Sequence, residues 1–107
     1  MAEEVLIVFT TWPDADTARA AARQLVEERL IACANLLPGV ESIYSWKGAI
    51  ETGSEVLVLM KSAIGRYCEL ESRIRALHPY EVPEIVCLRA EDGLPAYLQW
   101  IVAHCTG

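Results

Sequence analysis

One stretch decides how this chain folds: His78-Pro79-Tyr80-Glu81-Val82-Pro83-Glu84-Ile85. Each proline fixes its own φ near about −65° and moves the residue before it away from the helical region. We therefore expect His78 and Val82 to be extended, and any helix that precedes His78 has to end there. A stiff linker of this kind holds its histidine, tyrosine and glutamate side chains in fixed directions, which is one way to build a site.

The residues on either side of this linker predict a helix and a strand. Apolar residues recur every three or four positions between Tyr67 and Leu77, which predicts a helix with Ser62 as its candidate N-cap. The apolar run Ile85-Val86-Cys87-Leu88 after the linker predicts a strand. A short terminal helix is expected beyond it, because Pro95 is tolerated in a first helical turn.

The first third of the chain predicts a strand followed by a helix. Val5-Leu6-Ile7-Val8-Phe9 is a short β-branched apolar run, which is typical of a buried strand. Asp14 is a candidate N-cap for the helix that follows. The apolar residues of that helix share one face until about Arg29 or Leu30, where we expect it to end.

Two more strands are predicted in the middle of the chain. Pro38-Gly39 is a turn signal, and residues 42–47 then alternate between polar and apolar. Val56-Leu57-Val58-Leu59-Met60 is another apolar run. Because the two segments are joined by a short connection, an antiparallel hairpin is expected, with turns or a bulge at Gly48 and at Glu51-Thr52-Gly53.

The predicted order is strand, helix, strand, strand, helix, strand, helix. This order is that of the α+β ferredoxin-like fold, the split βαβ arrangement βαββαβ, with an added C-terminal helix. A chain of 107 residues has the length of one ordinary domain, so residues 1–107 are expected to form a single domain.

The composition predicts an oligomer. Hydrophobic residues make up 53% of the chain before its six glycines are added, against roughly 45–50% with glycine included in an average domain. A domain this small has too little interior to hide that excess. Three of the predicted strands are also apolar throughout instead of alternating, so both faces of the sheet should be buried. A partner subunit is the natural cover for the second face.

Charge and hydropathy exclude some classes of partner. The net charge of −6 argues against binding of nucleic acid, which needs a basic patch. The apolar runs are too short for a membrane span. The start Met1-Ala2-Glu3-Glu4 is acidic, unlike a signal peptide, so a cytoplasmic protein is expected.

The four cysteines are widely spaced and form no CxxC pair, which excludes a zinc finger. Reduced thiols and two disulfides remain as alternatives, and a cytosolic setting favours the thiols. Cys33, Cys68 and Cys87 lie in apolar contexts and are expected to fill the core. Cys105, near the end of the chain, is expected to be exposed.

The sequence predicts a binding protein rather than an enzyme. It contains no GxSxG elbow, P-loop or GxGxxG motif, although catalytic groups can also converge from distant positions. A metal site is one hypothesis, because the imidazole of His78 suits copper and Glu81 or Glu84 could add an oxygen. The alternative is that His78 only ends a helix, where a cation is mildly favourable. The other histidine, His104, is expected to be solvated.

A ligand pocket is a second hypothesis. The tyrosines and tryptophans could line it, with lysines and glutamates as polar anchors, but they could equally form core or subunit contacts. Lys61 follows an apolar strand, so its ammonium needs either solvent or an acid such as Glu84. The aromatic candidates are Tyr44, Trp46, Tyr80, Tyr97 and Trp100.

Several segments of the chain are distinctive when they are taken together: Glu28-Arg29-Leu30-Ile31-Ala32-Cys33-Ala34-Asn35, Pro38-Gly39, Ser45-Trp46-Lys47-Gly48, His78 to Ile85, and Tyr97-Leu98-Gln99-Trp100. In combination they resemble the CutA family of divalent-cation tolerance proteins. The resemblance runs from about Val5 to about Ala103. It implies a ferredoxin-like subunit in a tight homotrimer, similar to the PII signalling proteins, and a cytoplasmic role in tolerance to copper and other divalent cations.

The resemblance also implies a cleft between subunits, around which shared residues gather. These residues are Trp46, Lys61, His78, Pro79, Tyr80, Pro83, Glu84 and Trp100.

Two positions depart from the family's proposed copper site. Some bacterial members are described as binding copper through a cysteine at the end of the first strand and two adjacent histidines before the proline. This chain has Thr10 at the first position and Leu77 before His78, so one of three ligands remains and copper binding should be weak. The alternative function is a PII-like module that binds a small metabolite or anion through Trp46, Lys61 and Tyr80.

Overall fold

The structure is a computed structural model that describes residues 4–106. Apart from Glu4, the acidic start considered above lies outside the described residues. The elements in chain order are β1 (Val5–Trp12), α1 (Ala15–Glu27), β2 (Cys33–Trp46), β3 (Ala49–Ala63), a 3-10 turn (Ile64–Arg66), α2 (Tyr67–Leu77), β4 (Val86–Arg89) and α3 (Pro95–His104). This order confirms the predicted ferredoxin-like fold with an extra C-terminal helix.

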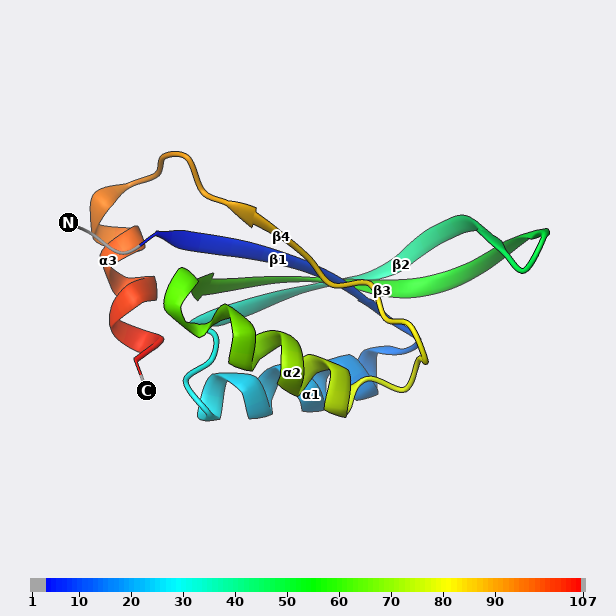
Figure 1. Cartoon of the computed structure of the whole chain (residues 1–107), viewed down its shortest axis with the longest axis horizontal. Helices are drawn as coiled ribbons and strands as arrows, with labels where there is room; N and C mark the ends of the chain where they lie inside the picture. The colour runs from blue at the N-terminus through cyan, green and yellow to red at the C-terminus, as the bar shows by residue number, and fades with distance from the viewer. Residues whose placement is uncertain (1–3, 107) are drawn as a thin grey trace.

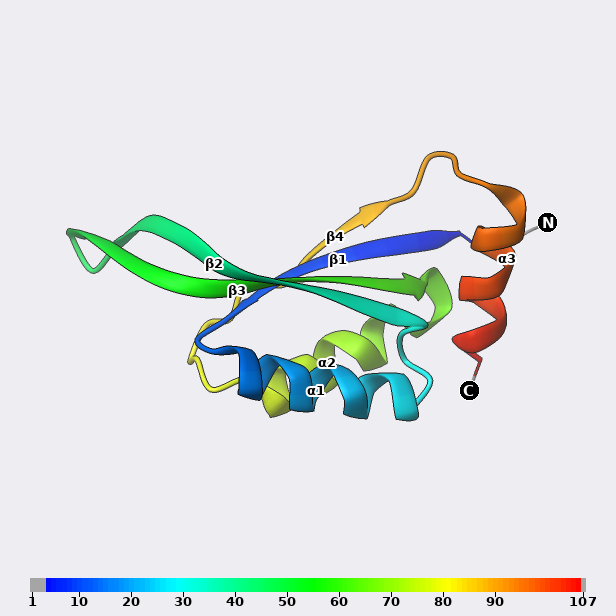
Figure 2. The same cartoon turned by 180° about the vertical axis from the view of Figure 1, so that it is seen from behind.

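The strands form one antiparallel sheet in the order β2-β3-β1-β4. Helices α1 and α2 lie side by side on one face of it, and α3 stands at the end of the sheet where both termini lie (Figures 1 and 2). The β2–β3 hairpin reaches beyond the helices at the opposite end. The molecule is therefore elongated, with extents of 47 × 25 × 22 Å.

The core lies between the sheet and the two helices. Val8 and Met60 of the sheet and Leu25, Leu70 and Ile74 of the helices are all fully buried there. Removing side chains of this size from water is the main stabilising contribution to the fold, at about 1.5–3 kcal/mol each. A second, smaller cluster holds α3 against the sheet through Val5, Ala32, Ala63, Ile101 and Cys105.

The predicted helix boundaries have identifiable causes. The carboxylate of Asp14 accepts a hydrogen bond from the Thr17 N–H at 2.8 Å, which confirms Asp14 as the N-cap of α1. Arg29 has a φ of 60°, a left-handed conformation that cannot continue the helix. Helix α2 ends as predicted at His78, which is extended with a ψ of 135° before Pro79.

Three local predictions were wrong. Pro38-Gly39 does not end a segment; it forms a bulge inside β2, where the pairing register shifts between Leu37 and Val40 and Gly39 has a φ of 75°. Glu51-Thr52-Gly53 pairs continuously with β2 and is not a turn. Ser62 does not cap α2, because it lies inside β3 and its hydroxyl donates to the Leu30 carbonyl at 2.6 Å.

The predicted turn at Gly48 is confirmed. Lys47 and Gly48 connect β2 and β3, and both have positive φ, 50° and 82°. Two residues with positive φ are typical of the tight turn whose twist matches that of the flanking strands.

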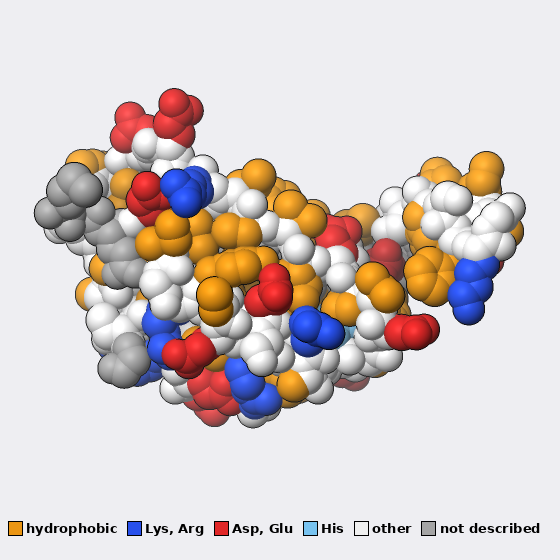
Figure 3. All heavy atoms as spheres, viewed as in Figure 1, with side chains coloured by type: hydrophobic (Ala, Val, Ile, Leu, Met, Phe, Trp, Pro, Cys, Tyr) orange, Lys and Arg blue, Asp and Glu red, His pale blue; other side chains and the backbone are white. Residues whose placement is uncertain are grey.

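The sheet face opposite α1 and α2, which we call the open face, is apolar. Residues paired directly across strands share a face, so Phe9 lies beside Leu59 on one side and Val86 on the other. Val86 and Leu88 of β4 are about half exposed, at 51% and 53%. Hydrophobic side chains are visible at the surface over the body and again on the hairpin (Figure 3). Helix α3 covers the end of this face at Val5 and Ala63, and no other element of residues 4–106 covers the rest of it.

Candidate functional site

A cavity of about 320 Å³ lies where the hairpin meets the linker between α2 and β4. We call it the acidic–aromatic cleft. Its walls are three aromatic rings and three carboxylates, together with a threonine and a valine. The lining residues are Thr11, Tyr44, Trp46, Glu55, Tyr80, Glu81, Val82 and Glu84.

Two elements position the side chains of the cleft. Beyond the bulge, Val40 pairs with Glu55, and alternation along β2 places Tyr44 and Trp46 on the same face as Glu55. The linker brings Tyr80 to this face, where its hydroxyl donates to the Glu55 carboxylate at 2.9 Å. Burial and this hydrogen bond raise the pKa of Tyr80 to about 12, so its hydroxyl stays protonated as a donor at neutral pH.

His78 holds the linker in place. Its ring is 7% exposed and lies 4.2 Å from the ring of Trp12 and 4.7 Å from that of Tyr80, measured between centroids. The Nε2 atom lies 2.6 Å from the Thr11 carbonyl oxygen, and Nδ1 lies 3.1 Å from the Tyr80 amide nitrogen. A carbonyl only accepts and an amide N–H only donates, so Nε2 carries the proton and Nδ1 accepts.

This hydrogen bonding bears directly on the hypothesis that His78 binds metal. A metal ligand needs a ring nitrogen with an available lone pair, and the one lone pair of this tautomer is used by the Tyr80 N–H. Copper could bind His78 only after that bond broke. Within the described residues, moreover, no group of three or more His, Cys, Asp or Glu side chains is arranged to hold a metal ion.

Two predicted site residues lie at the other end of the sheet. The Lys61 ammonium donates to the Asn35 side-chain oxygen and not to an acid such as Glu84, which was one of the two alternatives considered for it. Trp100 stacks on Tyr97, with ring centroids 5.8 Å apart. The Tyr97 hydroxyl lies 3.5 Å from Cys33 Sγ, and Cys33 pairs with Lys61 across the strands. We call this second group the α3 cluster; its members are Cys33, Lys61, Tyr97 and Trp100.

The predicted residues therefore separate into two groups. Trp46, Tyr80 and Glu84 line the cleft, and His78 supports it from behind. Lys61 and Trp100 belong to the α3 cluster. Glu55 was not anticipated, because its position opposite Val40 depends on the bulge that the sequence had suggested as a turn.

Two predictions about cysteines were wrong. Cys105 is buried at 3% exposure, because it packs in the small cluster beneath α3. Cys68 is exposed, because it lies on the solvent side of α2. Cys33 and Cys87 are partly exposed.

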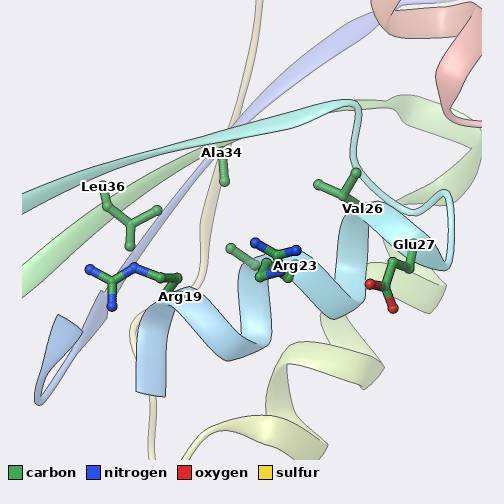
Figure 4. A pocket seen from close by; sticks show the side chains of 7 residues that line it. Arg19, Arg23, Val26, Glu27, Ala34 and Leu36 are labelled. Carbon is green, nitrogen blue, oxygen red and sulfur yellow. The ribbon is translucent and has the colours of Figure 1, made fainter. Parts of the chain in front are cut away.

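A second cavity, of about 330 Å³, runs between α1 and the edge strand β2. Ala34 and Leu36 point from β2 toward α1, which contributes Arg19, Arg23, Val26 and Glu27 to the rim (Figure 4). None of the residues predicted to form a site lies in this groove. It is a feature of the β2 edge, where one side of the strand has no pairing partner among residues 4–106.

Among residues 4–106, no helix combines the length and the apolar character needed to cross a membrane.

Comparison with known proteins gives consistent results. Residues 6–104 match the sequence profile of the family described as CutA1 divalent ion tolerance protein. The divalent-cation tolerance protein CutA of Thermus thermophilus is 46% identical over 99 residues, which cover 92% of this chain and 94% of the relative. Human protein CutA is 45% identical over 97 residues, which cover 91% of this chain but 54% of the relative.

Solved structures match the whole fold. A divalent cation tolerance protein from Thermus thermophilus has a TM-score of 0.93 at 42% identity and covers 95% of this chain and 99% of its own. CutA from Xylella fastidiosa has a TM-score of 0.93 at 41% identity, and the match covers 95% of this chain and 98% of the Xylella chain. The family is described by tolerance to divalent ions and not by a reaction. The chain belongs to the CutA1 divalent ion tolerance protein family.

Proposed function

We propose that this chain is a cytoplasmic, non-catalytic divalent-cation tolerance protein that responds to metal ions as a homotrimer. Family membership supports the general role, since the Thermus relative carries that description. The observation that carries the oligomer is the apolar open face. Leaving side chains such as Val86 and Leu88 half exposed on a sheet face forgoes stabilisation of about 25 cal/mol per Å² of apolar surface.

The separation of the two groups of residues also supports a site shared between copies. In one chain α3 stands at one end of the sheet, and the hairpin and linker whose residues line the acidic–aromatic cleft lie toward the other end (Figure 1). A neighbouring copy laid along the open face could bring its α3 cluster to the cleft. We propose that Trp46, Tyr80 and Glu84 of one copy face Lys61 and Trp100 of the next.

Copper binding in this proposal is weak and depends on single imidazoles. His104 is exposed, and its Nδ1 lies 2.8 Å from the Trp100 carbonyl oxygen, so Nδ1 carries the proton. That bond leaves the lone pair on Nε2, the arrangement that metal-binding histidines commonly have. Among residues 4–106, His104 is therefore the better placed of the two histidines for copper, and His78 serves to fix the linker.

Copper titration of the parent and of two matched variants tests this assignment. His78→Ala and His104→Ala each remove one of the two imidazoles. We expect His104→Ala to weaken copper binding and His78→Ala to leave it unchanged. Weaker binding by His78→Ala alone, in a variant that keeps its fold by circular dichroism, would show that His78 is the ligand.

A second candidate is a PII-like sensor, and the preformed cavity favours it. A walled cleft with no cluster of metal ligands in the described residues suits a small molecule better than a metal ion. Thermal-shift screening separates the two candidates, since a ligand that binds only the native state raises stability by mass action. Stabilisation by metal ions alone would favour the metal-binding role, and stabilisation by organic molecules alone would favour the sensor.

A further inference from the structure

We propose that the acidic–aromatic cleft binds a small organic ammonium cation, of the alkylated type that has methyl groups around its charge. This inference rests on the proposal that the cleft is a ligand site, and it names the class of ligand. Three features of the cleft support it: the sign of its charge, its aromatic walls and the spread of its carboxylates.

The charge of the cleft favours a cation. Its lining includes Glu55, Glu81 and Glu84 and contains no lysine or arginine. Lys61, proposed above to approach from a neighbouring copy, would add one positive charge against three carboxylates and leave the site acidic. An anionic metabolite would therefore meet repulsion in this cleft, whereas a cation would be attracted.

The aromatic walls favour an organic cation in particular. In a single chain Tyr44, Trp46 and Tyr80 are each exposed by 38–48%, so the chain itself leaves their rings open toward the cavity. Aromatic faces attract cations, and cages of such rings recognise alkylated ammonium groups. Trp46 already has a cation close to it, because the Lys47 ammonium lies 5.7 Å from its ring centroid. Lys47 does not line the cavity, so the cavity itself remains open to a ligand.

The spread of the carboxylates disfavours a bare metal ion. Magnesium and calcium require several oxygens that converge at about 2.0–2.6 Å from the ion. The three glutamates do not form such a cluster in the described chain, and the Glu55 carboxylate is already bonded to Tyr80. An alkylated ammonium ion holds its water weakly and has no coordination geometry to satisfy, so dispersed carboxylates and rings are sufficient for it.

The cleft is also rigid, which lowers the entropy lost on binding. Pro79 and Pro83 restrict the linker, and His78 fixes it to Thr11 while Tyr80 bonds to Glu55. The volume of about 320 Å³ is near the lower end of the usual range for ligand sites, roughly 300–1,000 Å³. The cavity therefore suits a small ligand.

A titration with two probes of similar shape tests the inference. Tetramethylammonium chloride carries the charge, and tert-butanol supplies methyl groups without it. We would follow the indole N–H signals by NMR at constant ionic strength, and assign that of Trp46 by its loss in Trp46→Leu. The expected result is a saturable shift at Trp46 with tetramethylammonium and no saturable shift with tert-butanol.

Four variants show whether the aromatic rings and the carboxylates of the cleft both contribute to binding. Trp46→Leu should weaken binding by roughly tenfold, the value of one cation–π contact, and Trp46→Tyr should retain most of the affinity. Because Trp46→Leu removes the reporter signal, its binding is followed by calorimetry. Glu84→Gln should weaken binding several-fold. Glu91→Gln changes the same charge at an exposed residue outside the cleft and should have no effect.

Two outcomes would overturn the inference. One is an equal response to both probes, which would make the cleft only an apolar pocket. The other is no saturable shift with tetramethylammonium in a protein whose spectrum shows a folded chain. Copper added to the same samples keeps the two proposals apart: copper binding without a response to tetramethylammonium would remove this inference and leave the metal-response proposal standing.

Discussion

His78 connects the rigidity of the linker to the shape of the cleft. It ends α2, donates to Thr11 on β1 and accepts from the Tyr80 amide, so one side chain joins a helix end, a strand and the linker. His78 is buried between Trp12 and Tyr80. Its hydrogen bonds therefore contribute more to stability than surface bonds, because a buried polar group without a partner destabilises the fold.

We predict that His78→Leu destabilises the protein by about 2–4 kcal/mol, because it leaves the Thr11 carbonyl and the Tyr80 amide without partners. Urea unfolding measures the change. His104→Leu is the matched control at an exposed position and should change stability by less than about 0.5 kcal/mol. Equal effects of the two substitutions would contradict the structural role of His78.

Two fully buried hydroxyls provide a second prediction. The Ser62 hydroxyl donates to the Leu30 carbonyl, whereas no partner within the described chain is found for the Thr10 hydroxyl. We expect Ser62→Ala to cost about 1 kcal/mol and Thr10→Val to be neutral or stabilising by up to about 1 kcal/mol. Thermal unfolding of the two variants checks this. A large loss of stability in Thr10→Val would mean that its hydroxyl is bonded in solution.

At the scale of the elements, a bidentate ion pair joins the end of α1 to α2. The Arg73 guanidinium donates to both oxygens of Glu28, at 2.9 and 2.8 Å. These bonds, with one from Gln24, lower the pKa of Glu28 from its ordinary 4.5 to about 2. The ion pair thus makes the packing of the two helices sensitive to acid.

We predict that the Glu28–Arg73 ion pair makes the free energy of unfolding depend on pH in the acid range. The folded pKa of Glu28 is depressed, so its contribution is complete above about pH 4.5 and is lost as the pH falls toward about 2. Arg73→Met should therefore reduce the slope of the free energy of unfolding against pH, as measured by urea unfolding across this range. Parallel curves for the parent and the variant would show that the pair contributes nothing in solution.

The element order, the start of α1 and the end of α2 could be predicted because they depend on local chemistry, such as the Asp14 cap and the proline after His78. The bulge at Pro38-Gly39 could not, because the same dipeptide also forms turns and only pairing with β3 decides between them. That ambiguity concealed the position of Glu55. Nor could the sequence decide between solvent and an acid such as Glu84 for the Lys61 ammonium, because its Asn35 partner is set by the pairing of β2 with β3.

At the scale of the whole molecule, one chain leaves two surfaces incomplete. The open face of the sheet has apolar side chains without cover, and the hairpin extends beyond the body with Ile43 and Ile50 exposed by 66% and 79%. Exposed apolar surface that is continuous over several strands is typical of a protein–protein interface. In the trimer that we propose, neighbouring copies would cover both surfaces and bring the cleft and the α3 cluster together.

We propose that copies of this chain cover the open face, and the mass of the protein in solution tests this most directly. Light scattering during gel filtration at micromolar concentration should give three times the 11.9 kDa of one chain. Leu88→Glu, which places a charge on the open face at the edge strand β4, should shift the mass toward that of one chain. A parent protein that elutes as a folded monomer would contradict the account.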